Sequence, residues 1–206
     1  MKRYFAEFVG TFGLTLAVIV SLGGGFFLPT SIIASLVVLL FVYSVGSISG
    51  AHLNPAVTIG LLSLGKIDAK NAVKYIIFQF LGSIAAMYIG GIMVFNPSLQ
   101  VLNSLPVFLA ECAGAFFLTF GIASVVYGKT PAPASGIVIG GSLLLGVSVA
   151  SVLSNGVLNP AVAFAIGSLS LVYLLGPIVG SVLGVWIFAF IAGEKGRFHF
   201  WRISVD

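Results

Sequence analysis

Long, mostly apolar stretches make up most of the chain, and short turns rich in glycine, proline or polar residues separate them. A hydrocarbon core about 30 Å thick needs about 20 helical residues, so each such stretch predicts a membrane-spanning helix. Two further apolar segments, Asn54–Leu64 and Asn159–Leu169, are too short to cross. The six predicted spans are Tyr4–Leu22, Ser31–Ser49, Lys74–Val94, Leu105–Tyr127, Ala134–Leu153 and Leu171–Ala192.

The composition excludes a soluble globular protein. Of 206 residues, 59% are hydrophobic and 7% are charged, whereas soluble domains carry about 25% charged residues. The single cysteine, Cys112, excludes an intramolecular disulfide framework and a cysteine-rich metal site. No catalytic Ser/His/Asp or Cys/His set and no metal-ligand set is recognisable. We therefore expect a membrane protein without enzymatic activity and without a cofactor.

The basic residues predict the orientation in the membrane. With six spans and an inner N-terminus, every lysine and arginine falls on the inner side and the outer loops carry no charge, which matches the positive-inside rule. This distribution predicts a multi-pass cell-membrane protein with both termini cytoplasmic, and it accounts for the net charge of +4. A cleaved signal peptide is not favoured, because Glu7 interrupts the first apolar run. The basic residues are Lys2, Arg3, Lys66, Lys70, Lys74, Lys129, Lys195, Arg197 and Arg202.

Two markers reveal an internal duplication within a single domain that covers residues 1–206. Ala6-Glu7 recurs as Ala110-Glu111 at an offset of 104 residues, and the Leu-Asn-Pro-Ala-Val sequence from Leu53 recurs from Leu158 at an offset of 105. The halves, about 1–103 and 104–206, contain three spans each, so they must enter the membrane with opposite orientations. Inverted repeats of this kind place a binding or conduction site near the midplane.

Each short segment begins with Asn-Pro-Ala: Asn54, Pro55 and Ala56, and again Asn159, Pro160 and Ala161. Asparagine is a strong helix N-cap, and proline at the first helical position loses no intrahelical hydrogen bond. Eleven helical residues span roughly 16 Å, about half of the hydrocarbon core. The pattern therefore predicts two re-entrant half-helices whose N-termini meet at the centre.

The loops before these half-helices, Gly50–Leu53 and Asn155–Leu158, indicate a pore. Extended backbone at this depth is tolerated only where it is buried in protein or lines a water-filled cavity. Its free carbonyls would accept hydrogen bonds, while Asn54 and Asn159 would donate them at the centre. Two converging positive helix ends would repel cations, so neutral solutes are favoured.

The Ser-Gly-Ala-His-Leu-Asn-Pro-Ala-Val-Thr sequence from Ser49 to Thr58, together with the second Asn-Pro-Ala motif at Asn159, resembles the signature of the major intrinsic protein family, the aquaporins and aquaglyceroporins. The resemblance extends from Glu7 to the sixth span. It implies an all-α membrane fold of six helices and two half-helices, a pore in each protomer of a homotetramer, and passage of water or small uncharged solutes.

Glu7 and Glu111 lie inside predicted spans at equivalent repeat positions, where an ionised side chain needs a specific partner. In similar family members this glutamate accepts hydrogen bonds from the re-entrant loop or from the histidine before the first motif. The resemblance therefore implies that both glutamates brace their loops, with His52 as the partner of Glu7. A proton relay is the alternative, although two carboxylates in separate halves favour bracing.

Family members usually filter solutes at four positions near the outer mouth. Counting from the two asparagines assigns these positions here to Ala34, Val147, Gly156 and Val162. Most aquaporins have arginine after the second motif, whereas Val162 resembles the plant tonoplast branch; that branch has histidine where this chain has Ala34. A wide, apolar and uncharged mouth is expected, unless another bulky side chain fills the space.

The sequence therefore predicts a passive channel whose partners are the lipid bilayer, water and small neutral solutes such as glycerol, urea or ammonia, and not nucleic acid. A strict water channel is one alternative. A secondary transporter is a second alternative, since inverted repeats and broken helices also build transporters. A structural or junction-forming protein with a closed pore is a third.

Overall fold

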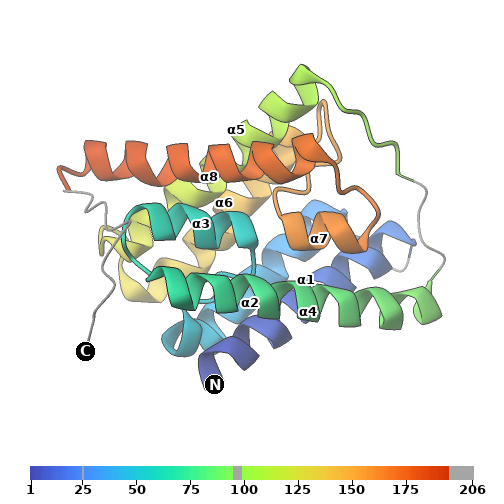
Figure 1. Ribbon diagram of the computed structural model, residues 1–206, viewed down its shortest axis with the longest axis horizontal. Helices are drawn as coiled ribbons and strands as arrows, with labels where there is room; N and C mark the ends of the chain where they lie inside the picture. Colours follow the sequence, from blue (N-terminus) through green and yellow to red (C-terminus); the bar gives the residue numbers. More distant parts are fainter. Residues whose placement is uncertain (25, 95–98, 195–206) are drawn as a thin grey trace.

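The computed structural model describes residues 1–24, 26–94 and 99–194, and these form helices without a strand (Figure 1). Within these described ranges, six helices are long and apolar enough to cross a membrane, which confirms the predicted all-α membrane fold. Two shorter helices, α3 (Pro55–Ser63) and α7 (Pro160–Ala165), follow the predicted Asn-Pro-Ala starts, and η1 (Ala132–Ala134) is a 3₁₀ turn before α6. The long helices are α1 (Lys2–Leu22), α2 (Thr30–Ser49), α4 (Ala69–Met93), α5 (Leu105–Val126), α6 (Ser135–Ala150) and α8 (Leu171–Ile191).

Helix α4 begins five residues before the expected Lys74. The carboxylate of Asp68 accepts a hydrogen bond from the backbone N–H of Asn71 at 2.9 Å, which is a helix N-cap. The apolar stretch begins after this cap, so a prediction based on hydrophobicity misses the polar first turn of α4.

The second short helix is shorter than predicted. It ends at Ala165, whereas the sequence pattern extended it to Leu169. Gly167 adopts φ +75°, and the Ser168 N–H donates to the carbonyl of Ala163 at 2.8 Å, so the chain turns left-handed and closes the helix. The first segment matches its prediction closely, since α3 ends at Ser63.

The helices pair in the same way in the two halves. Helix α1 packs on α2 and α4, and α5 packs in the same manner on α6 and α8. Gly82 on α4 abuts the backbone of Phe8 on α1, and Gly180 on α8 abuts the backbone of Cys112 on α5. The two glycines occupy equivalent positions, so α8 repeats α4 at an offset of 98 residues. Any side chain at either glycine would collide with the neighbouring helix backbone.

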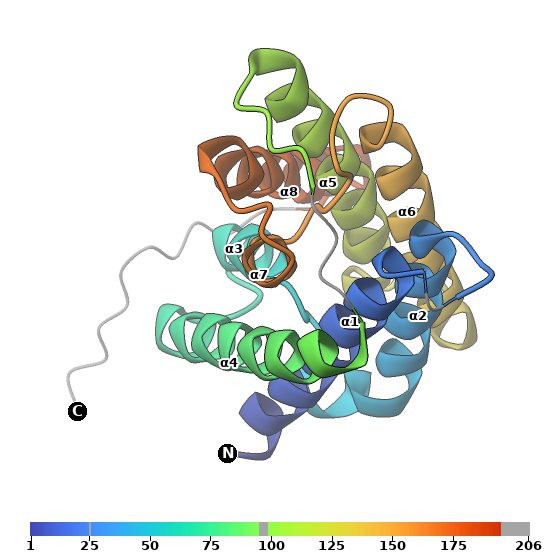
Figure 2. The ribbon, with the colours of Figure 1, turned by 90° about the vertical axis from the view of Figure 1, so that its right-hand side faces the viewer.

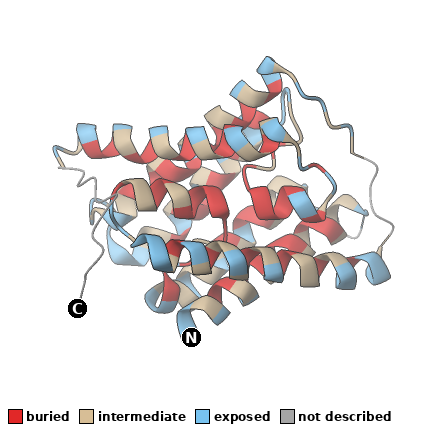
Figure 3. Ribbon diagram, viewed as in Figure 1, coloured by how far each residue is buried: buried red, intermediate tan, exposed pale blue. Residues whose placement is uncertain are grey.

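The short helices lie end to end in the interior, as Figures 1 and 2 both show. Each is covered by the third long helix of the opposite half: α8 packs on α3, and α4 packs on α7. Figure 3 shows that α3 and α7 are mostly buried, whereas the long helices expose their outer faces. Those faces are apolar, as at Ile92 and Phe190, which is the surface that a helix bundle presents to lipid.

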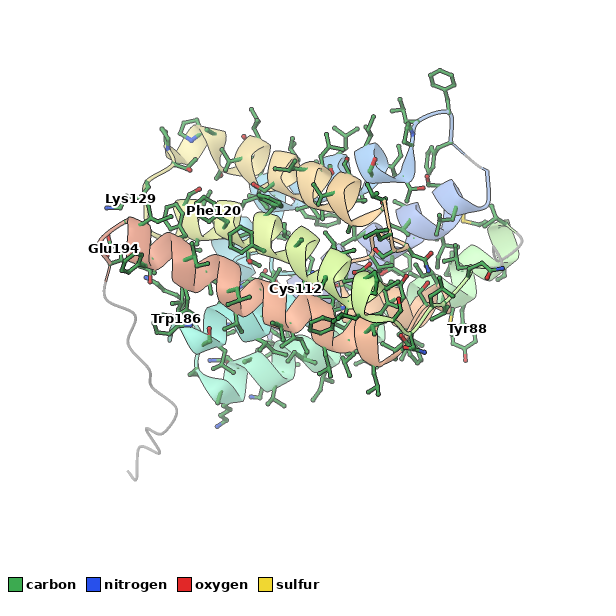
Figure 4. All side chains as sticks on the ribbon, turned by 90° about the horizontal axis from the view of Figure 1, so that it is seen from above. Tyr88, Cys112, Phe120, Lys129, Trp186 and Glu194 are labelled. Carbon is green, nitrogen blue, oxygen red and sulfur yellow. The ribbon has the colours of Figure 1, made fainter. Side chains whose placement is uncertain are left out.

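Three charged side chains lie near one another at one end of the bundle. Lys129 donates to Glu194 at 3.0 Å, and both lie at the opposite end from Tyr88 (Figure 4). Lys66 lies 3.9 Å from the centre of the Tyr127 ring, in a cation–π contact that joins the loop after α3 to the end of α5. The expected basic residues Lys195, Arg197 and Arg202 lie outside the described residues.

Candidate pore and its re-entrant loops

Asn54 and Asn159 connect the two loops to each other. The side-chain oxygen of Asn54 accepts from the Ala56 N–H at 2.8 Å, and that of Asn159 accepts from the Ala161 N–H at 3.1 Å. These are the N-caps that the sequence predicts for α3 and α7. Each Nδ2 donates one hydrogen bond of 2.9 Å across the centre, from Asn54 to the Leu158 carbonyl and from Asn159 to the Leu53 carbonyl. One N–H of each amide is used in this way, so one per asparagine is left to face a solute.

The residues before the two caps are held in a left-handed backbone conformation. Leu53 has φ +50° and Leu158 has φ +55°, and both side chains are fully buried. Such conformations cost about 1 to 3 kcal/mol each in a non-glycine residue, so the surrounding structure must hold them. They point the Leu53 and Leu158 carbonyls at the opposite asparagine.

Glu7 holds the first loop. Its buried carboxylate accepts from the backbone N–H groups of His52 at 3.0 Å and Leu53 at 2.7 Å. It also accepts from the Ser49 hydroxyl at 2.6 Å and from Gln79 Nε2 at 2.8 Å. His52 therefore contacts Glu7 through its backbone, while its ring points elsewhere and lies 3.1 Å from the Thr58 hydroxyl.

Glu111 holds the second loop in the same way but with three donors. It accepts from the backbone N–H groups of Val157 at 3.0 Å and Leu158 at 2.7 Å, and from the Ser154 hydroxyl at 2.8 Å. Pro177 occupies the position on α8 that corresponds to Gln79 on α4 and carries no side-chain donor. Both carboxylates are fully buried, and each satisfies backbone donors that would otherwise be costly to bury.

A cavity of about 320 Å³ runs past the two asparagines to the end of the bundle near the turn between α1 and α2. A second cavity, of about 280 Å³, runs toward the opposite end, where Ser47 and Ser135 line it. The two cavities meet at a shared set of residues. The shared residues are Ala51, His52, Val57, Ile122 and Ile139.

The four positions assigned to the filter all line the first cavity. Ala34 lies on α2, Val147 on α6, Gly156 in the second loop and Val162 on α7. Leucines and valines of α1, α5 and α6 complete much of this wall, and no Asp, Glu, Lys or Arg lines either cavity within the described part of the chain. Polar groups at this mouth come from Thr30, Ser31, Ser151 and Asn155.

Several residues that hold these loops were not identified from the sequence. The Tyr75 hydroxyl donates to the Ser49 carbonyl at 2.8 Å, and the hydroxyl of its counterpart Tyr173 accepts from the Asn155 N–H at 2.9 Å. Gln79 carried a usable signal, because an amide in the middle of an apolar span needs a partner. The tyrosines carried none, since tyrosine is common at the ends of membrane helices.

Comparison with known proteins identifies similar chains over almost the whole length. A family model described as "Major intrinsic protein" matches residues 1–188. Nodulin-26 of Glycine max is 33% identical, covering 91% of this chain and 77% of that protein, and Aquaporin Z of Rhodopseudomonas palustris is 32% identical, covering 94% of each. The X-ray structure of the aquaglyceroporin from Plasmodium falciparum superposes with a TM-score of 0.69 at 25% identity, covering 92% of this chain and 94% of that one.

Proposed function

Because the chain belongs to the major intrinsic protein family, and so is a membrane channel for water and small solutes and not an enzyme, we propose that its pore also passes glycerol, urea and ammonia. The observation that carries the proposal is the wall of the first cavity, where the described residues include no Asp, Glu, Lys or Arg. Val162 occupies the position where most aquaporins have arginine, so neither charge nor a long side chain narrows the mouth.

The small residues on the other sides of the mouth support the same proposal. Ala34 and Gly156 line the same cavity as Val162 and carry a methyl group or no side chain, and Val147 adds an apolar wall. A solute with a carbon skeleton can lie against these apolar walls while its polar groups contact the loop carbonyls and Asn155. Selection in such a pore depends on its diameter and on its hydrogen-bonding groups, not on charge.

We assign to Asn54 and Asn159 the discrimination against ions and protons. Each offers one unused N–H at the cap of a short helix, where a water molecule must accept a hydrogen bond. A water that accepts from both asparagines points its own hydrogens away, and this interrupts a chain of proton transfer. Glu7 and Glu111 serve as braces that fix the two loops, so neither carboxylate is free to act in a proton relay.

The decisive experiment is stopped-flow permeability of the purified protein in lipid vesicles, with water, glycerol, urea and ammonia as solutes. The wild type should conduct all four, without saturation and independently of ion gradients. Vesicles that pass water but none of the other three would contradict the proposed solute range and support a strict water channel. Dependence on an ion gradient would support a transporter.

Two variants test the filter from different walls. Val162→Arg and Ala34→Phe should each lower glycerol permeability roughly tenfold, a barrier increase of about 1.4 kcal/mol, with a smaller effect on water. Val162→Leu is the control, because it adds one methylene group and no charge. Unchanged glycerol flux in both test variants would show that these positions do not form the filter.

We also propose that the protein is a homotetramer in the cell membrane, with both termini cytoplasmic and inverted repeats at about 1–103 and 104–206. The likeness to the aquaporins supports the tetramer, and the position of Lys66 and Lys129 at one end of the bundle supports the orientation. Native mass spectrometry tests the tetramer, and protease accessibility of N- and C-terminal tags in intact cells tests the orientation.

A further inference from the structure

Helix α7 is held by α4, a helix of the other half. The Ser83 hydroxyl on α4 is fully buried and donates a hydrogen bond to the carbonyl of Ala161. This bond, the α7 anchor, joins two different repeats. About one turn earlier on α4, the ring of Phe80 meets the ring of Phe164 edge-on, with 6.1 Å between the ring centres. The short helix of the second repeat therefore takes support from the first repeat.

The α7 anchor lies on the side of α7 that faces away from the pore. Asn159, Val162 and Ile166 line the first cavity, and their spacing of three and four residues marks one face of a helix. Ala161 and Ser83 line neither of the two cavities. Ser83 therefore does not touch a passing solute, and it can act on the pore only through the position of α7.

An anchor from outside matters more for α7 than for a long helix. Helix α7 contains six residues, less than two turns, and the chain turns left-handed soon after it at Gly167. So short a helix has few hydrogen bonds of its own, and contacts with its neighbours decide its depth and rotation. Asn159 caps this helix and Val162 lies in its first turn, so a small rotation of α7 moves both residues.

Thr15 on α1 completes the hydrogen bonding of the Ser83 hydroxyl. A carbonyl can only accept, so the single proton of Ser83 points at Ala161. The Ser83 oxygen can then accept, and the Thr15 hydroxyl donates to it at 3.4 Å. Both hydroxyls are fully buried, where a polar group without a partner is costly. The chain of donors thus runs from α1 through α4 to α7.

The second half contains the same residue types without the same contact. Thr119 and Ser181 correspond to Thr15 and Ser83. The Thr119 hydroxyl donates to the carbonyl of Ser181 at 3.1 Å, and the Ser181 hydroxyl is buried without a hydrogen-bond partner in the described part of the chain. Helix α8 instead brings its backbone directly against Gly60 of α3. A serine hydroxyl at this position therefore supports α7 but not α3.

We propose that Ser83 is a positioning residue of the pore, which sets the depth and rotation of α7 and thereby the donor of Asn159 and the wall at Val162. Thr15 is a second positioning residue, because it supplies the hydrogen bond that the Ser83 oxygen accepts. The inference rests on the roles proposed above for Asn159 and Val162, whereas its test uses water alone.

The test is stopped-flow water permeability of vesicles that contain the full-length protein, expressed per folded channel at a temperature where every variant is folded. Ser83→Ala should conduct water about threefold more slowly, because the Asn159 donor is no longer held in line with the passing water. Ser181→Ala is the matched control and should conduct as the wild type, since it removes the equivalent hydroxyl, which has no partner among the described residues.

Two outcomes of this comparison would overturn the inference. One is equal water permeability of the two alanine variants. The other is a Ser83→Ala variant that unfolds at a lower Tm but conducts as well per folded channel as the wild type, because the hydroxyl would then contribute to stability alone.

Thr15 supplies an independent test with a matched pair. Thr15→Val keeps nearly the same shape but leaves the Ser83 oxygen without its donor, which weakens the α7 anchor and should lower water permeability about twofold. Thr15→Ser restores the hydroxyl and should conduct as the wild type. Equal permeability of the valine and serine variants would contradict the positioning role of Thr15. Failure of glycerol, urea and ammonia to pass would contradict only the proposed solute range, since both tests use water.

Discussion

The brace formed by Glu111 predicts a large loss of stability when the carboxylate becomes an amide. In Glu111→Gln one oxygen still accepts hydrogen bonds, but the new NH₂ group faces a donor. With the best orientation of the amide, Ser154 and Val157 keep their acceptor and the Leu158 N–H loses its own. Leu158 is fully buried, so that N–H has no access to solvent.

The expected cost follows from these contacts. Hydrogen bonds to a charged group contribute about 1.5 to 3 kcal/mol, and an unpaired buried donor costs about 1 to 3 kcal/mol, so a loss of about 2 to 4 kcal/mol is expected. For a chain of this size that lowers the apparent Tm by roughly 4 to 16 °C. Water permeability should fall as well, because the Leu158 carbonyl also accepts from Asn54.

The assay is thermal unfolding of the purified protein in detergent, together with water permeability in vesicles. Glu194→Gln is the matched control, since it makes the same chemical change in a partly exposed ion pair with Lys129. Surface pairs of this kind contribute about 0 to 1 kcal/mol, so the control should unfold close to the wild type. If Glu111→Gln unfolds no earlier than Glu194→Gln, the brace does not stabilise the loop and the reasoning fails.

Two further predictions concern the helices that support the pore. Gly180→Val should prevent stable assembly, because a side chain there collides with the Cys112 backbone. Gly141→Val is the control and should be tolerated, because a carbon added there meets open space. Size-exclusion profiles of the two purified variants distinguish these outcomes. Asp68→Ala should cost about 1 kcal/mol at pH 7 through loss of the α4 cap. Partial burial raises the pKa of Asp68, but the hydrogen bonds from Asn71 outweigh it and lower the pKa overall. The ionised cap therefore stabilises the folded protein at pH values above the ordinary pKa of aspartate, and this contribution is lost as the pH falls through the lowered pKa. Denaturation at several pH values should therefore show the cost of Asp68→Ala disappearing on strong acidification.

The sequence predicts most of the fold because lipid makes the pattern simple. Long apolar stretches give the six spans, and the two Asn-Pro starts give the short helices, whose caps the structure confirms. The length of α7 could not be derived, because its end depends on the left-handed turn at Gly167 and not on hydrophobicity. A glycine two residues beyond the end of an apolar segment is ambiguous when apolar residues continue after it.

The chemistry at the centre of the pore is less accessible to sequence reasoning. The two asparagines are recognisable because they repeat, and the glutamates because a carboxylate inside a span needs partners. The His52 ring contacts Thr58, which in turn contacts Gln79; these two residues lie on different helices and have no polar counterparts in the second half. Only the geometry brings them together, so the pattern of residues along the chain does not reveal the partners of that ring.

The crossing of each short helix by a long helix of the other half has a consequence for biosynthesis. Gly60 on α3 packs against the backbone of Ser181 on α8, and Asn54 donates to Leu158, 104 residues later. At a translation rate of about 5 to 20 residues per second, Ser181 leaves the ribosome roughly 6 to 24 s after Gly60. During this interval the first re-entrant segment has α4 of its own half beside it, but it lacks both α8 and the Leu158 carbonyl. The first re-entrant loop therefore gains these contacts only after α8 has been synthesised, so α8 completes the channel.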